Sequence, residues 1–96
     1  MVRFGITKNP TDLLEDISSR HKKLRKKLGL SQQELANRSG ISLGSLKRFE
    51  TTGQISFESL LKLAQILNRL EDFDVVFKSN DSIEDVEKLF SDKTRS

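Results

Sequence analysis

The sequence predicts an all-α fold: a small bundle of five helices, with a short N-terminal arm or strand before it and a small helix after it. Three observations favour this class. The 96 residues include one proline and five glycines, and 32% are charged, a composition typical of short amphipathic helices. Apolar residues recur at spacings of three and four along most of the chain. Ser or Asn, the preferred N-cap residues, precedes these runs.

The composition also excludes several classes of protein. There are no cysteines, so neither a disulfide framework nor a thiolate metal site is available. No apolar run approaches the roughly 18 residues of a membrane span, and the N-terminus lacks the apolar stretch of a secretory signal. We therefore expect a cytoplasmic protein without membrane contact, metal or cofactor.

The charge is unevenly distributed along the chain. Residues 1–70 hold thirteen Lys or Arg against six Asp or Glu, whereas residues 71–96 hold four against eight. A polyanion would bind the basic part.

The first helix is expected from residue 10 to about residue 28. Asn9 is a good N-cap, Pro10 suits the first turn, and Gly29 is a natural stop. Residues 1–9 are expected to be an arm or a single strand, which needs a partner edge to be stable. One apolar stripe follows the helix through Leu13, Leu14, Ile17, His21, Leu24 and Leu28.

Two short helices should follow. Ser31 and Glu34 form a capping-box sequence that begins the second helix, and Gly40 closes it. Ser42 then caps a third helix, which carries Gly44 in its first turn. The residues expected to face inward are Leu35, Ala36, Leu43, Leu46 and Phe49.

The fourth helix is expected over residues 57–70 after the N-cap Ser56, and its broad apolar face predicts the most buried helix of the bundle. Residues 71–77 predict a short fifth helix, with Phe73 in the core and Phe77 either in the core or on a dimer surface. Residues 82–90 predict an amphipathic helix that either docks on the domain or contacts a partner. The expected organisation is an arm (1–9), a domain (10–77) and a C-terminal segment (78–96).

The second and third predicted helices have the properties of a helix-turn-helix. Ala36 is small where the next helix must cross closely, and Gly40 permits a positive φ at the turn. Leu35, Ile41, Leu46 and Phe49 supply the apolar contacts between the helices.

The stretch LGLSQQELANRSGISLGSLKRFE resembles the Cro/C1-type (XRE) helix-turn-helix family, whose members have a five-helix, lambda-repressor-like domain. The resemblance covers about residues 17–77. It implies that the helix matching residues 42–50 lies in the DNA major groove, while the helix matching residues 32–38 braces it against the phosphates.

Functional residues follow from this resemblance position by position. Gln32 matches a glutamine that binds phosphate, Arg48 is the best candidate for reading a base, and Lys47 suits a phosphate. Arg25 and Glu50 match a partly buried structural ion pair. The expected DNA-binding residues are Gln32, Gln33, Arg38, Ser42, Leu43, Gly44, Ser45, Lys47, Arg48 and Thr52.

The third helix departs from the usual family pattern at two positions. Many relatives have a long polar residue where this chain has Leu43 and Gly44. Leu43 either touches a thymine methyl group or packs inward. Gly44 costs about 1 kcal/mol relative to alanine in a helix, so it either permits a close approach to DNA or relieves crowding in the turn.

Other charged residues allow a simpler interpretation. The basic run at residues 20–27 is either a phosphate-binding patch or the solvated face of a helix. His21 is expected to pack by its ring, because the chain has no second histidine to complete a metal site. Glu71, Asp72 and Asp74 have no nucleophile beside them, so we expect no catalytic residues and no enzymatic activity.

The sequence therefore predicts a sequence-specific repressor that binds a palindromic operator as a homodimer. SLKRFETTGQISFESLLKLAQIL followed by LEDFDVVF further resembles the small HipB-like antitoxins and autorepressors. That resemblance implies a HipA-like Ser/Thr kinase toxin as partner, alone or with a further small subunit. The alternatives are a stand-alone repressor, a protein-interaction adaptor that uses the fold as scaffold, and a multiprotein-bridging coactivator. Coactivators of that type usually carry a long basic N-terminal extension.

Overall fold

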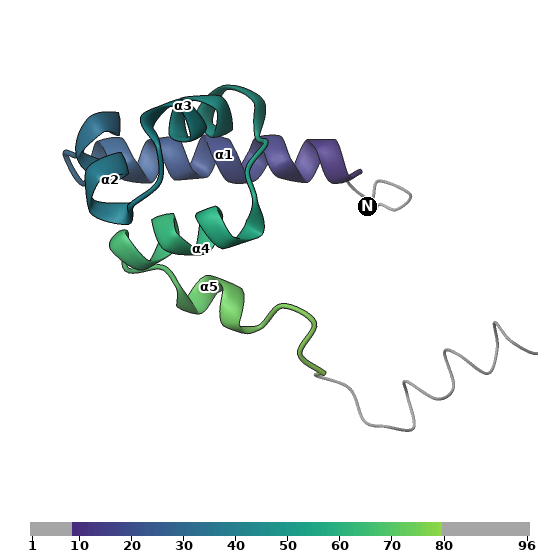
Figure 1. The fold of residues 1–96 in the computed structure, drawn as a ribbon. Coiled ribbons are helices and arrows are strands. Elements are labelled where there is room, and N and C mark those ends of the chain that lie inside the picture. The colour runs from purple at the N-terminus through teal and green to yellow at the C-terminus, as the bar shows by residue number, and fades with distance from the viewer. Residues whose placement is uncertain (1–8, 80–96) are drawn as a thin grey trace, which may run out of the picture.

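The computed structural model describes residues 9–79, which fold into five helices with no strand. These are α1 (Pro10–Lys27), α2 (Gln32–Ser39), α3 (Leu43–Thr52), α4 (Phe57–Ile66) and α5 (Glu71–Asp74). Figure 1 shows α3 on one side of the molecule and α4 and then α5 on the other. The all-α, five-helix prediction is confirmed. The predicted arm, apart from Asn9, and the predicted helix at 82–90 lie outside the described residues.

The predicted starts of the first four helices are confirmed by their capping hydrogen bonds. The Asn9 side chain accepts a hydrogen bond of 2.8 Å from the Asp12 backbone N–H at the start of α1. At α2 the Glu34 N–H donates to Ser31 Oγ at 3.0 Å, and the Ser31 N–H donates to Glu34 Oε1 at 2.9 Å. This reciprocal pair is a capping box, which satisfies two backbone donors that the helix itself cannot pair. The side chains of Ser42 and Ser56 cap α3 and α4 in the same way.

The core lies where α2, α3 and α4 meet the middle of α1. Its buried apolar residues are Leu35, Ala36, Leu46, Phe49, Leu63 and Leu67. The fourth helix is the most buried, as predicted: six of the ten residues of α4 are buried or half-buried, against four of eight in α2 and four of ten in α3.

The fourth helix is shorter than predicted, ending at Ile66 rather than at residue 70. Asn68 adopts a left-handed conformation with φ of 60°. Its N–H donates to the Gln65 carbonyl at 3.2 Å, and the Arg69 N–H donates to the Ala64 carbonyl at 2.8 Å. This is a Schellman ending, and asparagine tolerates the left-handed conformation better than most residues.

The apolar stripe of α1 is buried only in its middle. Ile17 and Leu24 pack against the core, and His21 is 8% exposed. Leu13 and Leu14 are more than 40% exposed, because the first turns of α1 project past the α3–α4 connection (Figure 1). The end of the stripe at Leu28 is exposed as well.

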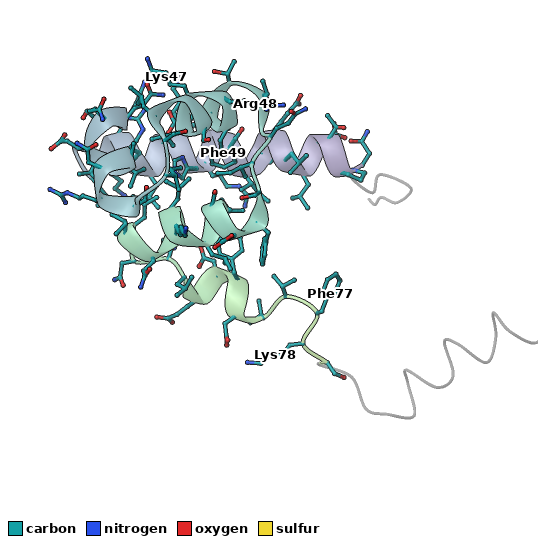
Figure 2. The ribbon with its side chains drawn as sticks, in the orientation of Figure 1. Lys47, Arg48, Phe49, Phe77 and Lys78 are labelled. Carbon is teal, nitrogen blue, oxygen red and sulfur yellow. The ribbon has the colours of Figure 1, made fainter. Side chains whose placement is uncertain are left out.

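The fifth helix is shorter than predicted, ending at Asp74 rather than at residue 77, and it closes the core only in part. Phe73 is half-buried and meets the ring of Phe57 edge to face, with 6.0 Å between the ring centroids. Phe77 is fully exposed, so it is not a core residue (Figure 2).

Two glycines fix the ends of the helices around α3. Gly40 has φ of 81°, as predicted for the turn of the helix-turn-helix. Gly53 has φ of 83°, and a Cβ there would lie 3.1 Å from the backbone of Leu14. The connection after α3 therefore contacts the backbone of α1 at Leu14.

Candidate nucleic-acid interface

The third helix has a buried side and an exposed side. Leu46 and Phe49 are fully buried, whereas Gly44, Lys47 and Arg48 are exposed. Figure 2 shows Lys47 and Arg48 on the side of the molecule opposite α5. Burial of the apolar side holds the exposed side in a fixed orientation.

Two of the expected site residues, Ser42 and Ser45, form hydrogen bonds with each other at the start of α3. Ser42 Oγ accepts the Ser45 N–H at 3.0 Å and donates to the Ser45 hydroxyl at 2.8 Å. Both hydroxyls lie at the exposed start of the helix, where unpaired backbone N–H groups favour an anion. The structure thus brings Ser42 and Ser45 together at the exposed start of α3.

Leu43 and Gly44 differ in their surroundings. Leu43 is half-buried and packs against the core. Of the two alternatives for Leu43, inward packing is therefore the one that this structure shows. A Cβ on Gly44 would meet nothing within 4 Å. The alternative that Gly44 relieves crowding in the turn is therefore wrong, because the position faces open space.

The end of α3 is joined to the following connection. The Arg48 guanidinium donates to Gln54 Oε1, and the Gln54 N–H donates to Thr52 Oγ1 at 3.1 Å. The Thr52 hydroxyl donates to the Arg48 carbonyl at 2.7 Å. Arg48 and Thr52 thus lie together, and Arg48 is oriented by a neutral partner that a stronger acceptor can replace.

Gln54 is a site residue that the sequence reasoning missed. A hollow of about 320 Å³ beside α3 is lined by Ser45, Arg48, Gln54, Ile55, Ser56 and Ser59. Its position in the sequence could have indicated this residue, because Gln54 has a polar amide side chain and directly follows the glycine that ends the third helix.

The expected site residues of α2 fall into two groups. Gln32 is half-buried, and its amide donates to Glu50 Oε1 at 3.0 Å. Gln33 is exposed and donates to Asn37 Oδ1 at 2.9 Å, and Arg38 is also exposed. Gln32 is therefore part of the contact between α2 and α3, whereas Gln33 and Arg38 face solvent.

Arg25 and Glu50 form a two-bond ion pair between α1 and α3. Arg25 Nε and Nη2 donate to the two Glu50 carboxylate oxygens at 2.8 and 2.9 Å. Arg25 Nη1 also donates to the Leu30 carbonyl at 2.8 Å. The two side chains are only 8% and 2% exposed. With Gln32, this pair ties α1, α2 and α3 together directly beneath the exposed side of α3.

The same carboxylate faces His21. His21 Nδ1 lies 3.1 Å from Glu50 Oε2, and the imidazole meets the Phe49 ring edge to face at 5.0 Å between centroids. Burial lowers the pKa of His21 below its ordinary value, outweighing the opposing attraction of Glu50. Burial alone would raise the pKa of Glu50, but the hydrogen bonds from Arg25 and Gln32, with the nearby positive charge, hold it below its ordinary value.

The basic run of α1 is divided between inside and outside. Lys22, Lys23, Lys26 and Lys27 are exposed, whereas Arg25 is buried in the ion pair. Arg25 is therefore not available to a phosphate. The exposed lysines remain open to either interpretation.

The carboxylates near α5 lie in exposed ion pairs. Asp72 accepts a hydrogen bond from Arg69 at 3.0 Å, and Asp74 accepts one from Lys78 at 2.9 Å. Within residues 9–79 no three His, Cys, Asp or Glu side chains are grouped as metal ligands would be. No helix in that part of the chain is long and apolar enough to cross a membrane.

Comparison with known proteins agrees with this geometry. The helix-turn-helix family model matches residues 22–73, which is just over half of the chain and runs from the second half of α1 to α5. No curated protein matches the chain. The chain belongs to the helix-turn-helix family of the Cro/C1 (XRE) type and is a DNA-binding transcription regulator.

Proposed function

We propose that the protein is a sequence-specific transcriptional repressor that binds a palindromic operator as a homodimer in the cytoplasm. The observation that carries this proposal is the exposed side of α3. Lys47 and Arg48 are exposed there, and the other side of the same helix is buried in the core. Two copies of α3 would enter successive major grooves roughly 34 Å apart. Repression then follows from occupation of a promoter.

The residues have distinct proposed roles. Arg48 reads a base, because its guanidinium can leave Gln54 for the two acceptors of a guanine. Lys47 and the start of α2 at Gln32 and Gln33 contact phosphates. Ser42 and Ser45 offer hydroxyls at the helix start. The remaining proposed DNA contacts are Arg38, Leu43, Gly44 and Thr52.

The test is a binding assay on DNA from upstream of the protein's own gene. Affinity should exceed that for random duplex by at least about 1,000-fold at the same salt concentration. Changing both Lys47 and Arg48 to alanine should abolish this preference. Equal affinity for both duplexes would overturn the claim of sequence specificity.

A narrower role as the autoregulating antitoxin of a HipA-like toxin-antitoxin module is supported by the family resemblance of residues 45–67 and 70–77. The kinase toxin would bind residues 78–96 or the side of the domain away from α3. Co-purification of a kinase-like protein encoded by the neighbouring gene would support this role. Its absence would leave a stand-alone repressor.

The competing function is a protein-interaction adaptor that uses the helix-turn-helix only as scaffold. The Lys47→Ala, Arg48→Ala variant separates the two functions. A repressor should lose operator binding and keep any protein partner. An adaptor would show no preference for its upstream DNA with or without these substitutions.

A further inference from the structure

A groove between α1, α4 and α5 lies outside the DNA-binding surface. Its volume is about 450 Å³, comparable to clefts that hold a drug-sized molecule. It therefore has room for a few large side chains. Its apolar lining consists of Ile17, Leu24, Leu60, Ala64, Leu67 and Phe73.

The groove also carries positive charge. Arg20 and Arg69 both line it, and both side chains are exposed at its edge. Asp72 is the one carboxylate in the lining and is paired with Arg69, so two cations and one anion leave the lining with a net charge of +1. An occupant with an apolar stripe and acidic flanks would match this surface.

The chain itself contains such a segment directly after the last described residue, Ser79. Ile83, Val86 and Phe90 recur at the spacing of one helical face. Four carboxylates and no cation lie in residues 81–87. The segment thus combines the two properties that the groove requires.

The connection between groove and segment is short. Phe73 of α5 lines the groove, and α5 leads directly to the end of the described chain (Figure 1). A segment that a few residues join to its own binding site has an effective concentration in the millimolar range, so even weak contacts favour binding within one chain.

We propose that residues 83–90 occupy the groove of their own chain as an amphipathic helix. Ile83, Val86 and Phe90 lie on the apolar floor, and the carboxylates face Arg20 and Arg69. Because the groove is formed by α1, α4 and α5, the acidic segment is held away from α3 and leaves Lys47 and Arg48 open to DNA.

The absence of cysteine from the chain allows a clean test. A nitroxide spin label is attached to the full chain at Ser91→Cys, twelve residues beyond Ser79, and amide signals are measured by NMR. The signals of Ile17 and Leu24 in α1 should lose most of their intensity. Those of Lys47 and Arg48 should keep theirs.

Two variants in the labelled background identify the contact. Changing Ile83 and Val86 to aspartate should restore the α1 signals, and unchanged chemical shifts for Leu46 and Phe49 would show that the fold of residues 9–79 is preserved. Lys88→Gln, on the opposite side of the predicted helix, is the matched control and should leave the intensity loss unchanged.

A mixed sample separates one chain from two. Isotope-labelled protein without the spin label is combined with spin-labelled protein at natural abundance. Full intensity in this sample supports docking within one chain. Intensity loss there would overturn the proposal in favour of a second copy. Absence of any loss in the singly labelled protein, or equal loss over α1 and α3, would also overturn it.

Discussion

The Glu50 side chain joins three helices through one carboxylate. Its carboxylate accepts two hydrogen bonds from Arg25 and one from Gln32, and it faces His21 at 3.1 Å. The residue stands near the end of α3 and is held by side chains of α1 and α2. This carboxylate therefore adds to the burial of Leu46 and Phe49 in fixing the orientation of α3.

Removing one partner of this ion pair should be costly. Arg25→Met should lower the free energy of unfolding by about 3 to 5 kcal/mol, because it leaves the Glu50 charge buried without its main partner. Urea denaturation followed by circular dichroism measures the change. The exposed pair of Arg69 and Asp72 provides the control, and Arg69→Ala should cost less than about 1 kcal/mol.

A second variant tests whether the loss of stability comes from an unpaired buried charge or from lost packing. Arg25→Met combined with Glu50→Leu should be more stable than Arg25→Met alone, since no buried charge remains. If the double variant is the less stable of the two, the buried charge is not the cause of the destabilisation.

His21 should make stability depend on pH in a narrow range. Its pKa in the folded protein lies below the ordinary value of 6.5, so the unfolded chain binds a proton that the folded chain does not. Stability should therefore fall as pH is lowered from about 7.5 through 6.5, the ordinary histidine pKa. The lowered pKa of Glu50 adds its own loss only below its ordinary value of 4.5.

The measurement is the Tm between pH 7.5 and 5.5. His21 is the single histidine of the chain, so His21→Leu should flatten this dependence. An unchanged slope in the variant would show that another group is responsible.

At the scale of the element, α3 is defined by its ends and by one unusual interior residue. Ser42 caps its start and Gly53 ends it in a left-handed conformation. Gly44 lies in the first turn and faces open space. Nothing in the described fold requires a glycine there, which leaves a close approach to DNA as the hypothesis for its presence.

The two glycines of α3 should respond in opposite ways to alanine. Gly44→Ala should stabilise the protein by about 1 kcal/mol, because alanine loses less backbone freedom in a helix. Gly53→Ala should destabilise it by at least about 1 to 2 kcal/mol, because its φ is positive and its Cβ would crowd Leu14. Thermal or urea denaturation of both variants tests this.

Operator binding then tests the role of Gly44. Gly44→Gln should keep the gain in helix stability but weaken or change the DNA preference. Unchanged operator binding by this stable variant would remove the close-approach hypothesis.

At the scale of the whole molecule, charge and shape divide the protein into two sides. Lys47 and Arg48 lie on the α3 side, whereas Lys78 lies at the opposite end beyond α5 (Figure 2). DNA contacts should therefore be confined to the α3 side, even though lysines are present on both.

Salt dependence can distinguish these sides. Lys47→Ala should reduce the slope of log Kd against log salt by about 1, because one phosphate contact is lost. Lys78→Ala removes the same charge on the other side and should leave the slope unchanged. Equal reduction by both variants would indicate only a long-range effect of net charge.

The sequence by itself determined the local features of this protein. Asn9, Ser31, Ser42 and Ser56 act on backbone groups only a few residues away, so their caps were readable without tertiary information. Gly40 was readable for the same reason. Family resemblance added the expected Arg25 and Glu50 pair, which periodicity alone does not reveal.

Only the tertiary structure decided which side chains meet across helices. Glu50 is 25 residues from Arg25 and 18 from Gln32, and their contact depends on how α1, α2 and α3 cross. The exposure of Leu13 at the projecting start of α1 also depends on how the helices are arranged, as does the groove between α1, α4 and α5. Periodicity identifies the apolar face of a helix, but the length of the neighbouring helices decides how much of that face is covered.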